Sequence, residues 1–459
     1  MAAQVSVSQV QEPALERTPI ATRLVALYVF LLFCRILEML PFFGLGHLRL
    51  MVLVTVAALL VVFLTGSVVR ALKTPIGALL IAWTAWMVVC MPFSTWRSET
   101  LDQFLNNWLK SLMVFFIVAG LASTTSAFEK VTSAMGWAAA AACIVVLPGI
   151  SAAGTGNGAN DRLYGVGTLS NPNEIAFHLW LGMSFLVLLA VRSKALKKWF
   201  LFAICGFELV LILKTVSREG LLLALVVLVF ALLRVSVTNK VKLSIVAFLL
   251  CGFAVVTLSP EAMDRYLTLF TSKVSGAAAQ SAEASSRLRH QKLMESIELT
   301  MRHPIFGVGM GVFMPASVEI AKERGGRVDW QVSHNSYTQV SSELGLPGIL
   351  LLLAIYVTAF QQVWRIDRAA KRRRREDVRQ TSFVLLIALA VLCIHFCFDS
   401  MAYVFYMPLI TGIAAAFALA YGPLTLDEEE AAPEPEAVLP AKPAVPVMRR
   451  NPYRFGRRR

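Results

Sequence analysis

The stretch QVSHNSYTQVSSELGLPGILLLL, residues 331–353, passes from a polar segment with a histidine and an asparagine into an apolar run. Gly345, Pro347 and Gly348 stand at the transition. Because such a change in polarity marks the boundary between water and hydrocarbon, we expect the chain to enter a bilayer at about residue 345. The His334–Asn335 pair then lies near the membrane surface.

The composition of the whole chain agrees with a membrane location. Of 459 residues, 57% are hydrophobic and 16% are charged, which is too apolar for an ordinary soluble domain. We therefore predict an all-α, polytopic integral membrane protein with about 12 transmembrane helices, since a span needs roughly 20 apolar residues. The candidate stretches lie near residues 24–42, 50–66, 75–93, 108–123, 131–149, 172–191, 199–215, 220–234, 242–258, 345–364, 381–398 and 402–422.

The distribution of Lys and Arg predicts the orientation. Basic residues gather in alternate connections, above all in RIDRAAKRRRREDVR (365–379), and cytoplasmic flanks collect such residues. We therefore place both termini in the cytoplasm. The net charge of +14 is then mainly a topological signal that also attracts anionic membrane lipids, and it does not indicate nucleic-acid binding.

The predicted spans divide the chain into five parts. A cytoplasmic N-terminal segment (1–23) precedes transmembrane helices in 24–258, an external loop domain (259–344), further helices in 345–422, and a disordered cytoplasmic tail (423–459). Within the loop domain we expect a helix in 285–304 that Pro304 ends, followed by the glycine-rich turn FGVGMGVF (306–313). No short internal repeat is evident.

His334 is the preferred candidate for a catalytic base. A histidine with a pKa near neutrality can take a proton from an attacking hydroxyl, and Asn335 adjoins it as a further polar group. An isolated histidine is more often structural, so this alternative stays open. Asp399 follows His395 at helical spacing, and it either orients a base or forms a buried polar pair with His395.

Basic residues near the outer boundary are candidates for phosphate recognition, since the planar guanidinium group binds phosphate oxygens in pairs. Arg218 and Lys214 interrupt two apolar runs in LKTVSREGLLLAL (213–225). Arg218 lies beside a helix N-terminus, where anions bind; the alternatives are a side chain that reaches the membrane surface or a pair with Glu219. Arg287 and Arg289 lie on the expected external helix, where a solvated face is the alternative.

A further polar cluster precedes the apolar stretch 172–191, in NDRLYGVGTLSNPNEIAFHL (160–179). Asn171 or Asn173 is a candidate helix cap, and Arg162 is either functional or a solvated loop residue. Arg35 and Glu38 are three residues apart, which favours a structural ion pair. The seven cysteines all lie in apolar stretches, and we predict no metal site and no cofactor.

Taken together, these motifs resemble the bacterial O-antigen ligase and O-antigen polymerase superfamily. The likeness rests on an arginine before GTLSNPN (167–173), the Ser217–Arg218 pair, Arg287 on the external helix, HPIFGVGMGVF (303–313) and SHNSYTQVSSELGLPGILLLL (333–353). It covers about residues 160–353. One departure is that Leu293 and Met294 stand where the family has an aromatic residue.

The resemblance implies a metal-independent, inverting glycosyltransferase at the periplasmic face of a Gram-negative inner membrane. The donor is then an O-antigen glycan on undecaprenyl pyrophosphate, and the acceptor is a sugar hydroxyl of lipid A-core. Under this interpretation His334 is the base, and arginines such as Arg218, Arg287 and Arg162 bind the pyrophosphate. The further candidates for binding the pyrophosphate or the glycan are Arg289, Lys214, Asn173 and Asn335. An O-antigen polymerase and a protein O-oligosaccharyltransferase of the same superfamily are the nearest alternatives.

A secondary transporter is the alternative from another class. Such proteins commonly consist of two matching halves, which predicts a prominent central loop. In this sequence the largest external segment follows the ninth apolar stretch instead, and this asymmetry argues against transport.

Overall fold

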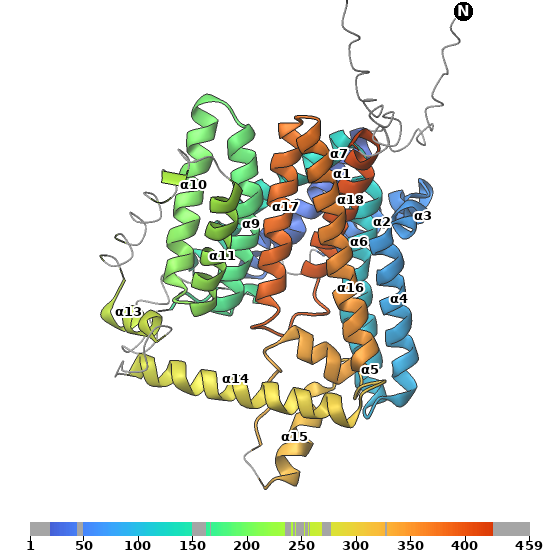
Figure 1. The fold of residues 1–459 in the computed structure, drawn as a ribbon, viewed down its shortest axis with the longest axis vertical. Coiled ribbons are helices and arrows are strands. Elements are labelled where there is room, and N and C mark those ends of the chain that lie inside the picture. Colours follow the sequence, from blue (N-terminus) through green and yellow to red (C-terminus); the bar gives the residue numbers. More distant parts are fainter. Residues whose placement is uncertain are drawn as a thin grey trace, which may run out of the picture.

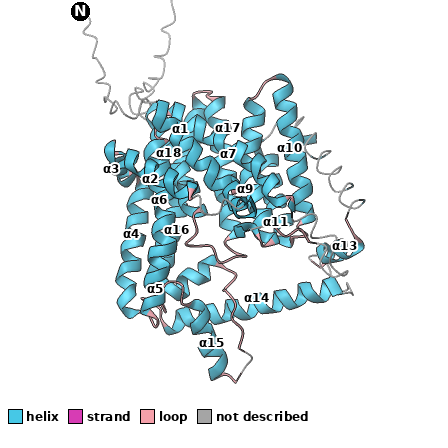
Figure 2. Ribbon diagram, turned by 180° about the vertical axis from the view of Figure 1, so that it is seen from behind, coloured by secondary structure: helices cyan, strands magenta, loops and turns pink. Residues whose placement is uncertain are grey.

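The computed structural model describes residues 19–43, 49–148, 162–165, 167–234, 258–268, 277–325 and 328–425, with a few single positions between 240 and 256. Every regular element in these ranges is a helix, as Figure 2 shows. The predicted tail (423–459) lies outside the described residues after residue 425, as do residues 1–18 of the N-terminal segment.

A bundle of helices forms the main body (Figure 1). Its longer members are α1 (Pro19–Cys34), α2 (Leu50–Leu64), α4 (Pro75–Cys90), α6 (Leu109–Leu121), α7 (Thr125–Val146), α9 (Pro172–Arg192), α10 (Ala195–Lys214), α11 (Arg218–Arg234), α16 (Ser336–Arg372), α17 (Glu376–His395) and α18 (Tyr406–Thr425). Shorter elements connect them: η1 (Ile36–Phe43), α3 (Ser67–Lys73), η2 (Met91–Phe93), α5 (Arg97–Gln103), η3 (Phe104–Trp108) and η4 (Gly167–Leu169).

The described residues do not confirm the predicted count of about twelve spans. Within the described residues, seven helices are long and apolar enough to cross a membrane, or eight if the bent pair α2 and α3 forms one span. The apolar helix α1 has only 16 residues, α11 has 17, and α10 carries Lys197, Lys198 and Glu208. The predicted span 242–258 lies mostly outside the described residues. The helices are consistent with a multi-pass membrane protein.

Small residues let the central helices approach closely. A Cβ atom at Gly182 of α9 would lie 2.7 Å from Ala139 Cβ of α7 and 2.9 Å from Phe33 Cε1 of α1. Close approach through small side chains is a common way for helices to associate in membranes. The contact fixes α9, whose N-terminus carries Asn171 and Asn173.

Three helices of the predicted loop domain lie together at one end of the bundle. They are α13 (Pro260–Leu267), α14 (Ala277–Arg302) and α15 (Phe313–Glu323). The long helix α14 crosses this end, whereas the α9–α10 and α16–α17 connections lie at the opposite end (Figure 1). The helix expected in 285–304 is part of α14, which ends two residues before Pro304.

Helix α16 consists of two segments that meet at Gly345. The backbone there has a positive φ (φ 70°, ψ −174°), which residues with a side chain rarely adopt. A Cβ atom would also lie 2.0 Å from the Ile305 carbonyl oxygen, so only glycine fits. Pro347 has no N–H for the Glu343 carbonyl, and this carbonyl instead accepts a 3.0 Å hydrogen bond from Gly309 N. The break coincides with the predicted entry into the bilayer.

Both sides of this break are held from other elements. From α4, Trp83 Nε1 donates to the Gly348 carbonyl and Trp86 Nε1 donates to the Leu344 carbonyl, each over 2.9 Å. From the glycine-rich turn, Val308 N donates to the Ser342 carbonyl over 2.8 Å. The carbonyls that the break frees are therefore paired, which fixes the direction of the short segment that follows His334.

Candidate functional site

A cleft of about 360 Å³ opens where α11, α14 and two loops meet. One loop precedes α16 and contains His334; the other follows α17 and contains Cys397. Its lining residues are Arg218, Glu219, Leu222, Ser286, Arg289, His290, Leu293, Ser333, His334, Asn335, Cys397 and Phe398. The cleft therefore brings together four of the predicted site residues, namely Arg218, Arg289, His334 and Asn335.

Four arginines from separate segments influence one another at this end of the molecule. Burial lowers the pKa of Arg162, and the charges of Arg289 and Arg218 lower it further. Burial also lowers the pKa of Arg265, to about 10, with the charges of Arg162 and Arg289 acting in the same direction. Cations that destabilise one another in this way form a strongly positive region, which favours a multiply charged anion.

A polar network holds Arg162 beside the α10–α11 turn. Its Nε atom donates to the Thr215 carbonyl over 3.1 Å, and its Nη2 atom donates to Asn173 Oδ1 over 3.4 Å. Ser217 Oγ also donates to Asn173 Oδ1, over 2.7 Å. Asn173 thus joins the loop before α9 to the turn before Arg218. Its neighbour Asn171 is the helix cap, since its side chain accepts from Asn173 N.

His334 has a backbone conformation that is rare for a residue with a side chain, with φ at 53°. Hydrogen bonds from flanking residues hold it there. Ser336 N donates to the Phe396 carbonyl and Ser336 Oγ to the Asp399 carbonyl, over 2.8 and 2.7 Å. Ser333 Oγ lies 2.8 Å from Ser400 Oγ. Such a strained position persists only where its surroundings enforce it, and it is frequent at functional sites.

The environment of His334 favours the neutral imidazole. Burial lowers its pKa, and the charges of Arg289 and Lys292 lower it further, against the opposing effect of Asp399. A neutral ring can accept a proton.

Asn335 caps the first segment of α16. Its Oδ1 atom accepts from Tyr337 N and Thr338 N over 3.0 and 3.1 Å, and its Nδ2 atom donates to the Cys397 carbonyl over 3.2 Å. The side chain therefore fixes the start of the helix directly after His334.

Asp399 is buried in the loop between α17 and α18. Its Oδ1 atom accepts from Ser400 N over 2.8 Å, and its charge reaches His334. The side chain of His395 pairs with Glu219 and not with Asp399, because His395 Nδ1 is bonded to Glu219 Oε1. His395 also stacks on Phe177, with ring centroids 3.7 Å apart. A role for Asp399 in orienting the base stays a prediction.

Four of the predicted substrate-binding residues do not line the cleft. Arg162 and Asn173 belong to the polar network beside the α10–α11 turn, and the other two are Arg287 and Lys214. Arg287 is 77% exposed in its side chain and pairs with Glu283 over 2.6 Å. Lys214 is exposed at the end of α10, where its carbonyl accepts from Leu163 N over 2.9 Å. Arg289 takes the place expected for Arg287, because residues two apart on a helix face in nearly opposite directions.

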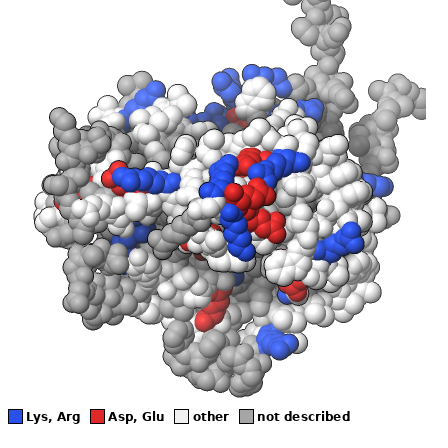
Figure 3. All heavy atoms as spheres, turned by 90° about the horizontal axis from the view of Figure 1, so that it is seen from below, with Lys and Arg blue, Asp and Glu red and all other residues white. Residues whose placement is uncertain are grey.

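The outer face of this end carries mixed charge. Seen from below, basic and acidic side chains lie side by side (Figure 3). Arg302 pairs with Glu298 and Glu323, over 2.7 and 2.8 Å, and Arg324 also pairs with Glu298. Charge is therefore largely balanced on the outer face of α14, in contrast to the arginines around the cleft.

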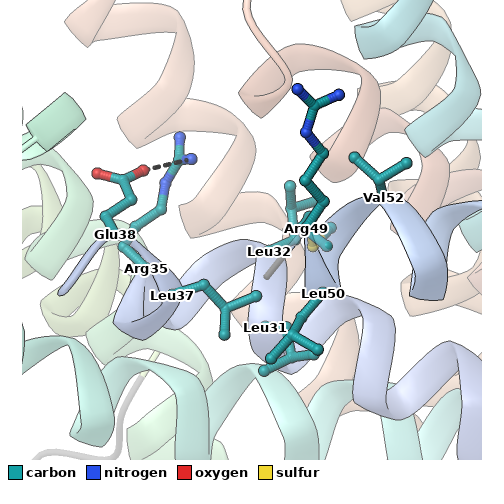
Figure 4. A pocket seen from close by; sticks show the side chains of 9 residues that line it. Leu31, Leu32, Arg35, Leu37, Glu38, Arg49, Leu50 and Val52 are labelled. Atoms are coloured by element: carbon teal, nitrogen blue, oxygen red, sulfur yellow. Dashed lines mark hydrogen bonds and ion pairs between the residues drawn. The ribbon is translucent and has the colours of Figure 1, made fainter. Parts of the chain in front are cut away.

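A smaller cavity of about 260 Å³ lies between the end of α1, η1 and the start of α2 (Figure 4). It contains the ion pair expected between Arg35 and Glu38, which measures 2.9 Å. Glu38 also accepts from Thr168 N and Thr168 Oγ1, each over 2.8 Å. The pair therefore joins η1 to the segment before α9, which is a structural role.

Sequence reasoning did not single out Arg265, Lys292 or Ser333 as site residues, and it considered Glu219 only as a partner of Arg218. Arg265 lies in PEAMDRYL, immediately after the predicted ninth span, and this proximity to the membrane surface was a usable signal. In the described ranges, no group of three or more His, Cys, Asp or Glu side chains is arranged to hold a metal ion.

Comparison with known proteins relates part of the chain to a protein family. Residues 200–353 match the family model described as O-antigen ligase, and no curated protein matches the chain. Members of this family are glycosyltransferase-like enzymes. The matched segment contains α11, α14 and the loop of His334, which form most of the cleft. The match supports membership of the chain in the O-antigen ligase/polymerase superfamily.

Proposed function

We propose that the chain is an O-antigen ligase, an inverting glycosyltransferase of lipopolysaccharide biosynthesis. It moves the O-antigen glycan from undecaprenyl pyrophosphate to a sugar hydroxyl of lipid A-core, at the periplasmic face of the inner membrane. One observation carries the proposal: a half-buried imidazole and two arginines, Arg218 and Arg289, line one cleft, most of which is formed by the segment that matches the family model.

The chemistry follows from these groups. A pyrophosphate is a good leaving group once its charge is neutralised, and Arg218 and Arg289 supply charge at the cleft wall. The acceptor oxygen attacks the anomeric carbon from the side opposite the departing phosphate oxygen, which inverts the configuration. The hydroxyl proton passes to His334, and the electron pair of the broken bond leaves with the pyrophosphate.

The positions of Arg162 and Arg265 extend the positive region beyond the cleft. Burial and neighbouring cations disfavour both charges in the free protein. A bound pyrophosphate offsets the mutual repulsion of these arginines. Part of its binding energy therefore comes from removing an unfavourable interaction of the free protein. Metal ions are not required by this arrangement, and we propose metal-independent transfer.

Transfer by the purified full chain in proteoliposomes tests the proposal. The donor is the lipid-linked glycan extracted from the source cells, and the three arms contain lipid A-core, no acceptor, or a pilin-like protein. We expect glycan on lipid A-core, with the same rate in the presence of a chelator. Longer glycan on the carrier alone indicates a polymerase, glycosylated protein indicates an oligosaccharyltransferase, and movement of donor without a new bond indicates a transporter.

The variant His334→Ala tests the assignment of the base. We expect the protein to insert and fold while transfer falls by roughly 10²-fold or more, the usual contribution of a general base. Thermal unfolding in detergent provides the control for fold. Normal transfer by this variant contradicts the assignment.

A further inference from the structure

Lys292 of α14 is fully buried, although it lies in the segment outside the predicted spans. Its Nζ atom donates to Glu295 Oε2, Ser317 Oγ and the Asp329 carbonyl, over 2.9, 2.8 and 3.1 Å. The ammonium group therefore has three partners, which matches its three donors. These partners come from α14, from α15 and from the loop that leads to His334.

Glu295 completes this buried cluster as an ionised partner. Burial alone would raise its pKa, but hydrogen bonds from Ser317, Gln291 and Lys292 bring the pKa below its ordinary value. Lys292 and Glu295 are thus a charged pair with all the donors of the ammonium used. A buried pair of this kind is seldom a net source of stability compared with apolar side chains. The position of this pair beside the cleft therefore points to a role other than packing.

The bond to Asp329 places Lys292 at the start of the loop that presents the imidazole. The far end of this loop is fixed by the bonds of Ser333 and Ser336 to the loop after α17. The Lys292 bond is a second attachment, on the side of α14. Arg289, which lines the cleft, is one helical turn before Lys292.

We propose that Lys292 is a positioning residue for His334. Lys292 holds the loop 328–335 against α14 and places a fixed positive charge near the imidazole. The proposal rests on the proposed function, because it assumes that His334 accepts the proton. Lys292 itself lies outside the cleft lining and does not act on the substrate.

The charge effect has to be weighed against the other groups around His334. Helix α14 contributes Arg289 and His290, α11 contributes Arg218 and Glu219, and the loop after α17 contributes Asp399. Burial, Arg289 and Lys292 lower the pKa of His334, and Asp399 raises it. Removing the Lys292 charge should therefore raise this pKa.

The pH dependence of transfer by Lys292→Met tests the proposal with the native lipid-linked glycan and lipid A-core. Loss of transfer as the pH falls reports protonation of the base. We expect this acidic limb to move to higher pH, on the order of half a pH unit. We also expect kcat to fall about tenfold, with little change in the donor KM because the arginines are untouched. Lys322→Met makes the same substitution at an exposed lysine of α15 and should match the wild type.

Glu295→Gln is the second variant, and it keeps the proposal testable if Lys292→Met does not fold. It leaves the ammonium without its negative partner, so the acidic limb should move to lower pH. An unmoved limb in the folded variants, or a shift in the same direction for both, overturns the proposal and leaves Lys292 a structural residue. His334→Ala separates the two proposals: transfer by this variant refutes the base itself, whatever Lys292 does.

Discussion

At the scale of single residues, the site depends on how His334 is held. Its left-handed backbone is unfavourable for a residue with a side chain, at a cost on the order of 1 kcal/mol. Ser333 and Ser336 on either side are bonded to the loop 396–401. The bonds of these neighbours thus fix the position of the imidazole.

The pH dependence of transfer follows from the environment of His334. Burial, Arg289 and Lys292 lower its pKa, so the ring stays neutral below the ordinary histidine value of about 6.5. We expect kcat/KM to hold its plateau in mildly acidic buffer and to fall only at lower pH, since only the neutral ring takes the proton. An acidic limb centred above pH 6.5 would contradict this expectation. Arg289→Gln removes a positive charge that lowers the pKa of His334, so it should move the limb to higher pH.

Two variants on α14 distinguish the contributions of Arg289 and Arg287 to donor binding at the predicted phosphate site. Arg289→Ala should raise the donor KM by roughly 10- to 100-fold, the usual value of a hydrogen bond to a charged group. Arg287→Ala, two residues away, removes only an exposed pair with Glu283 and should leave the donor KM nearly unchanged. Donor titrations at saturating acceptor measure both. An equal rise in the donor KM of both variants would show that Arg287 also belongs to the phosphate site.

At the scale of elements, the junction in α16 connects the segment after His334 to a membrane span. The Gly345 backbone, the bonds of Trp83 and Trp86, and the turn at Gly309 all act on the same few residues. The glycine-rich turn was predictable, because closely spaced glycines favour left-handed backbone. Gly307, Gly309 and Gly311 indeed have positive φ.

Gly345→Ala should disrupt this junction. A Cβ atom there would lie 2.0 Å from the Ile305 carbonyl oxygen, and the positive φ is unfavourable for alanine. We therefore expect the free energy of unfolding to fall by well above 1 kcal/mol. The matched control is Gly66→Ala, where φ is 66° and no atom lies within 4 Å of the new Cβ. Thermal unfolding in detergent measures the difference. Equal losses in the two variants would show that the close contact at residue 345 has no effect.

At the scale of the whole molecule, the helices of the predicted loop domain and the basic α16–α17 connection lie at opposite ends (Figure 1). This arrangement fits the orientation expected from the distribution of Lys and Arg. Cys397 offers a probe, because it lines the cleft and is exposed, whereas Cys34, Cys90, Cys143 and Cys205 are buried.

A membrane-impermeant maleimide should label Cys397 from the periplasmic side of intact cells. Cysteine at position 374, introduced as Arg374→Cys, should react only after permeabilisation. The background carries Ser in place of Cys251 and Cys393, and Cys397→Ser is the negative control. Added lipid-linked donor should slow the labelling of Cys397. The reverse pattern of accessibility would place the cleft in the cytoplasm and exclude a periplasmic transferase.

Features that depend on local sequence were predictable, and those that depend on tertiary contacts were not. Most apolar stretches coincide with helices, and the Arg35–Glu38 pair forms as its spacing indicates. The choice between Arg287 and Arg289 depends on which face of a largely polar helix meets the bundle, and the sequence of α14 has no strong apolar stripe to decide this. The Glu219–His395 bond and the approach of Arg265 join segments far apart in the chain.

The paired carbonyls at the α16 junction have a consequence for where chemistry can happen. A sugar carried on a lipid can slide sideways in the bilayer, but its height above the hydrocarbon is set by the length of its headgroup. Trp83 and Trp86 bond the junction to α4, which restricts the movement of the imidazole-bearing end of the helix along the membrane normal. Under the proposed function, two indoles outside the cleft lining would therefore set the depth of the reaction, and a carrier with a longer or shorter headgroup would present its anomeric carbon at the wrong level.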